Sequence, residues 1–290
     1  MSLLNAALRR LFDLLLFPFQ SLPAAVGIVF VSLLAALGML WAFKRTSNQA
    51  GIEAAKRRMY AGIFEIRLFN DSFKQIWRAQ GAILRANLTY LRHQLVPMLF
   101  ILPPLVLAIA QLQFHWAYAP PAAGDRTELA ATFVEGWQAG GGVPTGASGK
   151  PQAELELPAG LTAETPALWI PSTRTLVWRL RVDQPGDQTL GIRIGGRLYE
   201  KRLAGARPLE RRSPVRPGRS WVDQFVYPAE SPLPADGVLD AVTVRLKPAE
   251  VALPGFALRE MASVPAWMTL FFVLSIVFAF ALRKRFGVTF

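Results

Sequence analysis

The sequence contains no cysteine and only two histidines. Without cysteine the chain cannot form a disulfide, so each of its domains must be stabilised by its own core. His93 and His115 lie near opposite ends of a single apolar stretch, which prevents them from sharing a metal ion or a catalytic triad. The sequence offers no other catalytic, metal-binding or cofactor-binding pattern. We therefore predict a protein that is not an enzyme and uses no cofactor.

Charge is also missing from three long stretches, residues 22–43, 94–113 and 263–282. Each is close to the roughly 20 residues that an α-helix needs to cross the bilayer core. The second stretch contains Pro97, Pro103 and Pro104, which a membrane helix tolerates when its neighbours satisfy the freed carbonyl groups. The sequence predicts three transmembrane helices, of which the second is kinked.

The positive charges are concentrated in two of the segments between and after these stretches. Residues 44–93 and the tail 283–290 are strongly basic, whereas residues 114–262 are nearly neutral. The positive-inside rule places the two basic segments in the cytoplasm, and the N-terminus and residues 114–262 outside. We expect a multi-pass protein of the inner (cytoplasmic) membrane. Topology explains the net charge of +12, so no specific nucleic acid partner is predicted.

The two segments before the second apolar stretch favour helices. In residues 1–21, apolar residues recur at helical spacing, which predicts an amphipathic helix in the outer membrane interface. Residues 44–93 contain two helical patterns whose ends must return to the same membrane face, so we predict an antiparallel, coiled-coil-like hairpin. This basic hairpin is either a solvated connector or a docking arm for anionic lipids, a ribosome or an acidic partner.

Residues 114–262 have the pattern of a β-sandwich. Apolar and polar residues alternate in residues 176–182 and 190–194, and Gly195-Gly196 predicts a tight turn into a strand at residues 197–203. Further strands are expected at residues 129–134, 153–157, 221–227 and 242–246. One loop of this domain is rich in arginine, and it is either a solvated surface or a contact for lipids or a partner. Its arginines are Arg207, Arg211, Arg212, Arg216 and Arg219.

Small residues form a stripe along the first apolar stretch. Gly27, Ala35 and Gly38 lie on this stripe, which permits close packing against another transmembrane helix. We therefore expect a membrane partner subunit or a homo-oligomer. Nothing ionisable lies in the middle of the three apolar stretches, which argues against an ion or proton pathway.

Two short segments resemble the YidC/Oxa insertase superfamily, at the exit from its first core span and the entry to the next. These segments are Lys44-Arg45-Thr46-Ser47-Asn48-Gln49 and Gln94-Leu95-Val96-Pro97-Met98-Leu99-Phe100-Ile101-Leu102-Pro103. Three spans are similar to the minimal form of the family, such as the third subunit of the endoplasmic-reticulum membrane protein complex and archaeal relatives. Unlike bacterial members, this chain has no positive residue within the first span and has its β domain between the second and third spans.

The resemblance implies an insertase or biogenesis factor with a slightly polar groove that opens to the cytoplasm and receives nascent membrane proteins. It implies that Lys44 and Arg45 attract acidic flanks of the substrate at the mouth of the groove. The other candidate groove residues are Ser32, Gln94, Thr269 and Ser275. The alternative is a non-enzymatic membrane adaptor or scaffold whose β domain binds an outer ligand or partner.

Overall fold

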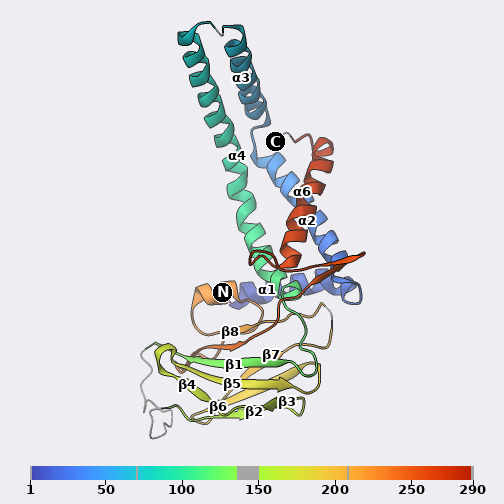
Figure 1. The fold of residues 1–290 in the computed structure, drawn as a ribbon, viewed down its shortest axis with the longest axis vertical. Helices are drawn as coiled ribbons and strands as arrows, with labels where there is room; N and C mark the ends of the chain where they lie inside the picture. Colours follow the sequence, from blue (N-terminus) through green and yellow to red (C-terminus); the bar gives the residue numbers. More distant parts are fainter. Residues whose placement is uncertain (1, 70, 136–149, 208, 289–290) are drawn as a thin grey trace. The chain divides into compact units, whose positions relative to one another are not determined.

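The computed structural model describes residues 2–69, 71–135, 150–207 and 209–288 (Figure 1). Three of its helices are long and apolar enough to cross a membrane, and they are α2 (Ala24–Thr46), α4 (Phe73–Trp116) and α6 (Ala266–Phe286). A region rich in β-sheet lies between α4 and α6 in the sequence. The predicted general kind of fold, with three helices that could span a membrane and a region rich in β-sheet, is confirmed.

The chain divides into two compact units. We call Met1–Ile28 with Ile109–Thr269 the β unit, and Val29–Ala108 with Leu270–Phe290 the helical unit. The boundaries fall inside α2, α4 and α6, so the first residues of α2 and α6 and the last residues of α4 belong to the β unit. Each unit is described separately below.

In the helical unit, α4 is a single helix of 44 residues that joins the predicted second hairpin helix to the predicted second span. Its backbone remains helical through Pro97, Pro103 and Pro104. The basic residues Lys44 and Arg45 form the last turn of α2, where positive charge interacts favourably with the helix dipole. Likewise, α6 extends through Arg283, Lys284 and Arg285.

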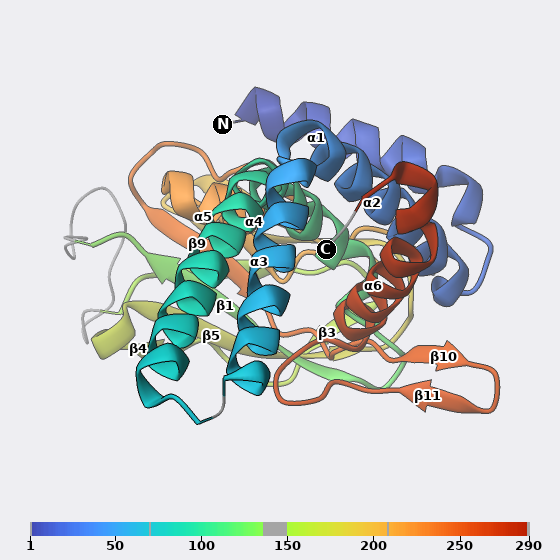
Figure 2. The same cartoon turned by 90° about the horizontal axis from the view of Figure 1, so that it is seen from above.

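Helix α3 (Gln49–Leu68) has Asn48 as its N-cap residue. The Asn48 side chain accepts a hydrogen bond of 2.9 Å from the Gly51 N–H. This N-cap satisfies one of the free amides of the first turn. Helix α3 lies beside the first half of α4 (Figures 1 and 2), and a Cβ on Gly62 would lie 2.5 Å from Ile83. Glycine is therefore needed at this position for the two helices to approach closely. The base of α3 packs through Ile52 into an apolar cluster with α2 and the chain end.

Two antiparallel sheets make up most of the β unit. The larger has strand order β3–β5–β1–β9–β8 with β4 also paired to β5, and the smaller has the order β2–β6–β7. The strands of the larger sheet are β1 (Arg126–Phe133), β3 (Leu161–Ala163), β4 (Leu168–Ile170), β5 (Thr175–Val182), β8 (Val215–Pro217) and β9 (Leu239–Val244). Those of the smaller sheet are β2 (Ala153–Glu156), β6 (Gln188–Ile194) and β7 (Arg197–Leu203).

Both sheets contribute to one hydrophobic core. Alternate residues of β1 and β5 are buried, and they share a cluster with Ile192 and Ile194 of β6 and with Tyr199 of β7. This is the alternation that the sequence shows, because successive side chains of a strand point to opposite faces. Strands β6 and β7 meet at Gly195 and Gly196, which both have positive φ angles, as a two-residue hairpin turn requires.

The strand predicted at residues 221–227 is wrong, because this segment forms helix α5 (Trp221–Val226). Ser220 precedes the helix, and its side chain accepts a hydrogen bond of 3.3 Å from the Asp223 N–H. A serine followed by an acidic residue three positions later is an N-terminal helix signal. The apolar residues of this segment fit the spacing of a strand as well as that of a helix. The N-cap at Ser220 favours the helix.

The β unit also contains helix α1, two short 3-10 helices and a separate hairpin. Helix α1 (Ser2–Leu16) is followed by the short 3-10 helix η1 (Phe17–Phe19) and then by α2. Another 3-10 turn, η2 (Pro171–Thr173), links β4 to β5. Strands β10 (Val251–Leu253) and β11 (Phe256–Leu258) pair only with each other, and this hairpin precedes α6.

Candidate functional site

The helical unit contains an open apolar groove between α2 and α4. It has a volume of about 570 Å³. The residues that line it are Ala35, Gly38, Met39, Trp41, Ala42, Arg45 and Thr46 of α2 and Phe100, Ile101, Pro104, Leu105 and Ala108 of α4. A second hollow of about 250 Å³ adjoins it at Met39 and Ile101 and reaches α6. All three candidate spans therefore contribute to an apolar recess in this unit.

Three small residues of α2 leave space on its side of the groove. A Cβ on Gly38 would meet no atom within 4 Å among the described residues, and Ala35 and Ala42 lie on the same face. The stripe is predicted to pack against another helix. Within this chain Ala35 and Gly38 line an open groove, and packing of a partner's helix against them stays a prediction. Gly27 belongs to the β unit and is closely packed, because its Cβ would lie 3.2 Å from Trp116.

The α4 side of the groove is shaped by proline. Proline has no N–H, so Pro103 and Pro104 cannot donate the helical hydrogen bonds to the carbonyl groups of Leu99 and Phe100. Phe100 and Pro104 both line the groove. The apolar recess thus lies beside the Phe100 carbonyl group, to which Pro104 cannot donate, and such a group attracts water or a polar part of a ligand.

One end of the groove carries a positive charge. Arg45 lines this end and belongs to the last turn of α2, next to Thr46. The Thr46 hydroxyl donates a hydrogen bond of 2.8 Å to the Ala42 carbonyl, so it is held within the helix. Lys44 is exposed and does not line the groove. An apolar segment with an acidic residue at its end matches this combination of surfaces.

The remaining predicted groove residues lie elsewhere. Ser32 and Ser275 are buried, and the Ser32 hydroxyl donates to the Phe271 carbonyl at 3.3 Å, which links α2 to α6. Gln94 lies partly buried on α4, and Thr269 lies in the first turn of α6 in the β unit. Of the six predicted residues, the structure brings only Arg45 to the lining of the larger groove. The sequence pattern did not indicate that Pro104 of α4 lines the opposite wall.

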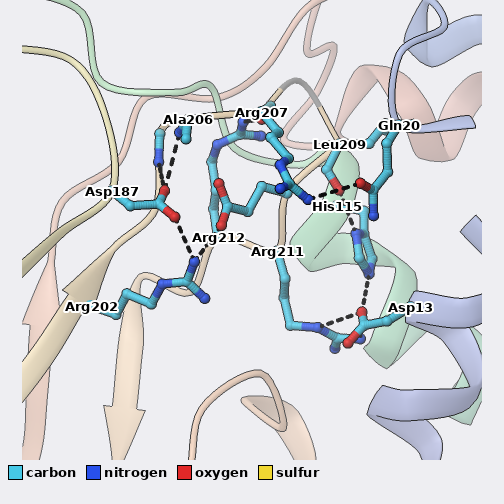
Figure 3. A network of polar contacts seen from close by, with 12 residues as sticks. Asp13, Gln20, His115, Asp187, Arg202, Ala206, Arg207, Leu209, Arg211 and Arg212 are labelled. Atoms are coloured by element: carbon cyan, nitrogen blue, oxygen red, sulfur yellow. Dashed lines mark hydrogen bonds and ion pairs between the residues drawn. The ribbon is translucent and has the colours of Figure 1, made fainter. Parts of the chain in front are cut away.

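The β unit contains a polar network that joins α1 to the arginine-rich loop (Figure 3). Asp13 of α1 lies 2.8 Å from Nη2 of Arg211 and 3.4 Å from Nε2 of His115. The other ring nitrogen of His115, Nδ1, donates to the Leu209 carbonyl at 3.0 Å. Burial alone would raise the pKa of Asp13, but the hydrogen bonds from His115 and Arg211 outweigh it and lower the pKa to about 2.

The same loop is held to the sheet by further ionic contacts. Asp187 accepts hydrogen bonds from the amides of Gly205 and Ala206 and pairs with Arg202 at 2.8 Å (Figure 3). Burial would raise the pKa of Asp187, but these hydrogen bonds lower it below the usual range. The loop is therefore an ordered part of the β unit.

Most of the five loop arginines bond within the β unit. Arg207 donates to the Gln20 side chain, Arg211 to Asp13, and Arg216 to the carbonyls of Ser231 and Glu200. Arg212 is only 2% exposed and donates to the Tyr118 carbonyl, so it is turned away from any lipid or partner, which corrects the prediction for this residue. Arg219 is exposed. The contact with lipid or a partner stays a prediction for the accessible arginines.

Comparison of the chain with models of protein families, with curated proteins and with solved structures finds no match in any of the three.

Proposed function

We propose that the chain is a membrane protein insertase or a membrane-protein biogenesis factor, and that its groove between α2 and α4 receives hydrophobic segments of other proteins. The groove carries this proposal, because it combines an apolar lining, the Phe100 carbonyl group to which Pro104 cannot donate, and a terminal Arg45. A polar group in hydrocarbon costs several kcal/mol when nothing satisfies it. A recess that offers it water or a carbonyl group lowers the barrier to insertion.

The proposed orientation follows from the basic residues. Under the positive-inside rule, residues 44–93 and the chain end lie in the cytoplasm, and the N-terminus and residues 114–262 lie on the outer side of the inner membrane. Arg45 then marks the cytoplasmic mouth of the groove. Acidic flanks of an incoming segment would be attracted there by Arg45 and by the exposed Lys44.

The paired helices α3 and α4 act in this proposal as a cytoplasmic hairpin that receives the nascent chain. Large apolar side chains are exposed near the end of the pair, including Leu68, Phe73 and Trp77. The rings of Phe73 and Trp77 meet edge to face with centroids 6.1 Å apart. Exposed aromatic residues beside basic ones suit a contact with an apolar nascent segment, a ribosome or anionic lipids.

A membrane adaptor is the second candidate, and one feature of the β domain favours it. A hollow of about 340 Å³ on the larger sheet is lined by charged side chains, among them Arg126, Glu128, Arg179, Arg245 and Lys247. Such a surface fits a charged ligand or partner outside the membrane. In this proposal the β domain is a sandwich that binds the partner, and the hairpin couples it to a cytoplasmic protein.

Photo-crosslinking in cells tests the insertase. Photoreactive residues replace Trp41 and Phe100, which line the groove, and Val273 and Val277, which are exposed apolar residues of α6 outside both hollows. We expect Trp41 and Phe100 to trap many newly made membrane proteins, and we expect the α6 positions to trap far fewer. Arrest of translation before irradiation should remove the groove products.

The adaptor predicts a different result. If Trp41 and Phe100 trap one or two stable partners whose yield does not change after translation arrest, the groove binds a resident subunit and the insertase proposal fails. If the groove and α6 positions trap the same set of proteins with equal yield, the groove has no special role.

A further inference from the structure

Helix α1 is held to the β unit by polar contacts, while three of its leucines are exposed. Asn5 is buried and donates to the Gln224 carbonyl at 2.8 Å, and Asp13 pairs with Arg211. Leu4, Leu11 and Leu14 are exposed, Leu14 to 74%, whereas Leu16 at the end of the helix is buried. A helix on a domain in water is stabilised by burying its apolar face. Exposed leucines on a helix that is held through polar side chains suit an apolar environment outside the protein.

Two other parts of the β unit expose apolar side chains in the same manner. On α5, Trp221 is 67% exposed and Val222 is also exposed. At the β10–β11 turn, Phe256 is 61% exposed. In Figure 1, α1 and the red-orange β10–β11 hairpin lie at one end of the β unit, and strands β1–β7 lie toward the other. Helix α5 and the β10–β11 hairpin can be found by their labels in Figure 2.

Each of these elements is tied to the outer end of a different candidate span. Helix α1 is joined to α2 through η1 and a short link, since α1 ends at Leu16 and α2 begins at Ala24. Helix α5 is tied to α4, because the side chain of Gln113 donates to the Val226 carbonyl at 3.0 Å. The β10–β11 hairpin is followed by a bridge between Met261 and Val264 directly before α6.

We propose that these elements form a collar that is immersed in the head-group region of the membrane, in the leaflet next to the β unit. The collar consists of Leu11, Leu14, Phe17, Trp221, Val222 and Phe256. Its partner is the lipid bilayer itself, because every collar element is connected to a residue near the end of a membrane span. The outward apolar side chains would contact acyl chains, and the exposed Arg10 would reach the phosphate groups.

Tryptophan at the collar fits this environment. Its ring is largely apolar and carries one N–H donor, so tryptophan is enriched where the bilayer meets water. The polar network of Asp13, His115 and Arg211 then has a clear role, since it fixes α1 to the β unit from the side opposite to the lipid. The inference requires only that the chain spans a membrane and does not depend on insertase activity.

Site-directed spin labelling tests the collar, and the absence of native cysteine makes every introduced label unique. Single variants Leu14→Cys, Trp221→Cys and Phe256→Cys of the full chain are labelled with a nitroxide and reconstituted in vesicles of phosphatidylcholine and phosphatidylglycerol. Leu168→Cys is the matched control, because Leu168 of β4 is an apolar residue of the same unit that is 63% exposed and lies outside the collar. Leu11→Cys serves as a second α1 position if Leu14→Cys does not fold.

Collisions of the label with oxygen, which enters lipid, and with a water-soluble nickel chelate are compared by power saturation. At the collar positions we expect oxygen collisions to exceed nickel collisions several-fold relative to Leu168→Cys. Equal nickel access at the collar and at Leu168 would place the collar in water and overturn the proposal. Access to neither reagent at the collar would show that another protein surface covers it, which overturns the lipid assignment as well.

Discussion

Asp13 and Arg211 are 198 residues apart in the sequence, and their side chains meet at 2.8 Å. This pair, together with His115, attaches the first helix of the chain to the arginine-rich loop of the β domain. A second contact of Arg211, to the Gln111 side chain at 2.9 Å, brings the C-terminal end of α4 into the same network. One arginine therefore connects α1, the loop and α4.

Replacing Asp13 with asparagine should loosen α1. The variant keeps the size of the side chain but removes the charge that pairs with Arg211 and His115. Because the Asp13 side chain is half exposed, solvent screening limits the expected loss to about 1 kcal/mol. Hydrogen exchange of the α1 amides in the reconstituted protein measures the effect, and we expect faster exchange in Asp13→Asn than in the parent protein.

The same pair predicts a pH dependence. The folded pKa of Asp13 is about 2, below its ordinary value of 3.8, so the carboxylate contributes its full stabilisation above about pH 4. That contribution is lost as the pH falls from about 4 to about 2, and protection of α1 should fall with it. Asp13→Asn should lack this part of the pH profile. A control, Glu250→Gln, removes the partner of the exposed Arg259 and should change neither measurement.

The sequence alone predicted the features that depend on local pattern. The long uncharged stretches located the three candidate spans. The alternation of apolar and polar residues located β5 and β6, and Gly195-Gly196 located the turn between β6 and β7. Helix α5 was missed because its apolar residues fit a strand as well as a helix, and the cap at Ser220 was overlooked. Periodicity alone does not separate these two structures in so short a segment.

The long-range contacts could not be read from the sequence. Nothing in the arginine-rich loop indicates that Arg212 becomes buried while Arg219 stays exposed, since both follow from how the chain folds back on itself. The small-residue stripe was recognised from the sequence, but the different surroundings of its members were not. Gly27 packs against Trp116, whereas Gly38 faces open space. The neighbouring elements, not the residue type, determine this difference.

A buried ion pair should be the most sensitive polar contact of the β domain. Lys201 of β7 is 1% exposed, and its ammonium group contacts the carboxylate of Glu230 and the Ser213 carbonyl, the latter at 2.8 Å. Burial lowers the pKa of Lys201, while Glu230 opposes that shift. Glu230→Gln leaves the ammonium group without a counter-charge and should cost about 3–5 kcal/mol.

Thermal unfolding of the purified protein measures this loss, and two further variants define it. The apolar double variant Lys201→Met with Glu230→Leu should recover most of the stability, because no unpaired charge remains. Glu128→Gln affects the exposed Arg245–Glu128 pair at 3.5 Å and should change stability by less than about 0.5 kcal/mol. A Glu230→Gln variant as stable as Glu128→Gln would contradict the expected burial of Lys201.

Filling the groove should separate its function from the stability of the fold. Gly38→Leu adds a side chain where a Cβ meets no described atom within 4 Å, and replacing glycine favours the helix by about 0.5–1 kcal/mol. We expect the protein to remain folded and the yield of crosslinks from Trp41 to drop several-fold. Gly27→Ala provides the contrast: its Cβ would lie 3.2 Å from the Trp116 ring and outside the groove, so it should leave the yield of crosslinks from Trp41 unchanged.

Reversing the charge at the groove end should alter which segments are inserted. Arg45→Glu replaces attraction of acidic flanks by repulsion, and one such interaction near the surface is worth about 1 kcal/mol, or about fivefold in rate or occupancy. We expect reporter segments with acidic flanks to insert more slowly, and segments with basic flanks to be unaffected or faster. Arg85→Glu is the matched control, because it makes the same change in net charge at an exposed position of α4 outside the groove. If both variants slow acidic and basic reporters equally, overall charge or topology governs the effect, and Arg45 has no role in selecting the substrate.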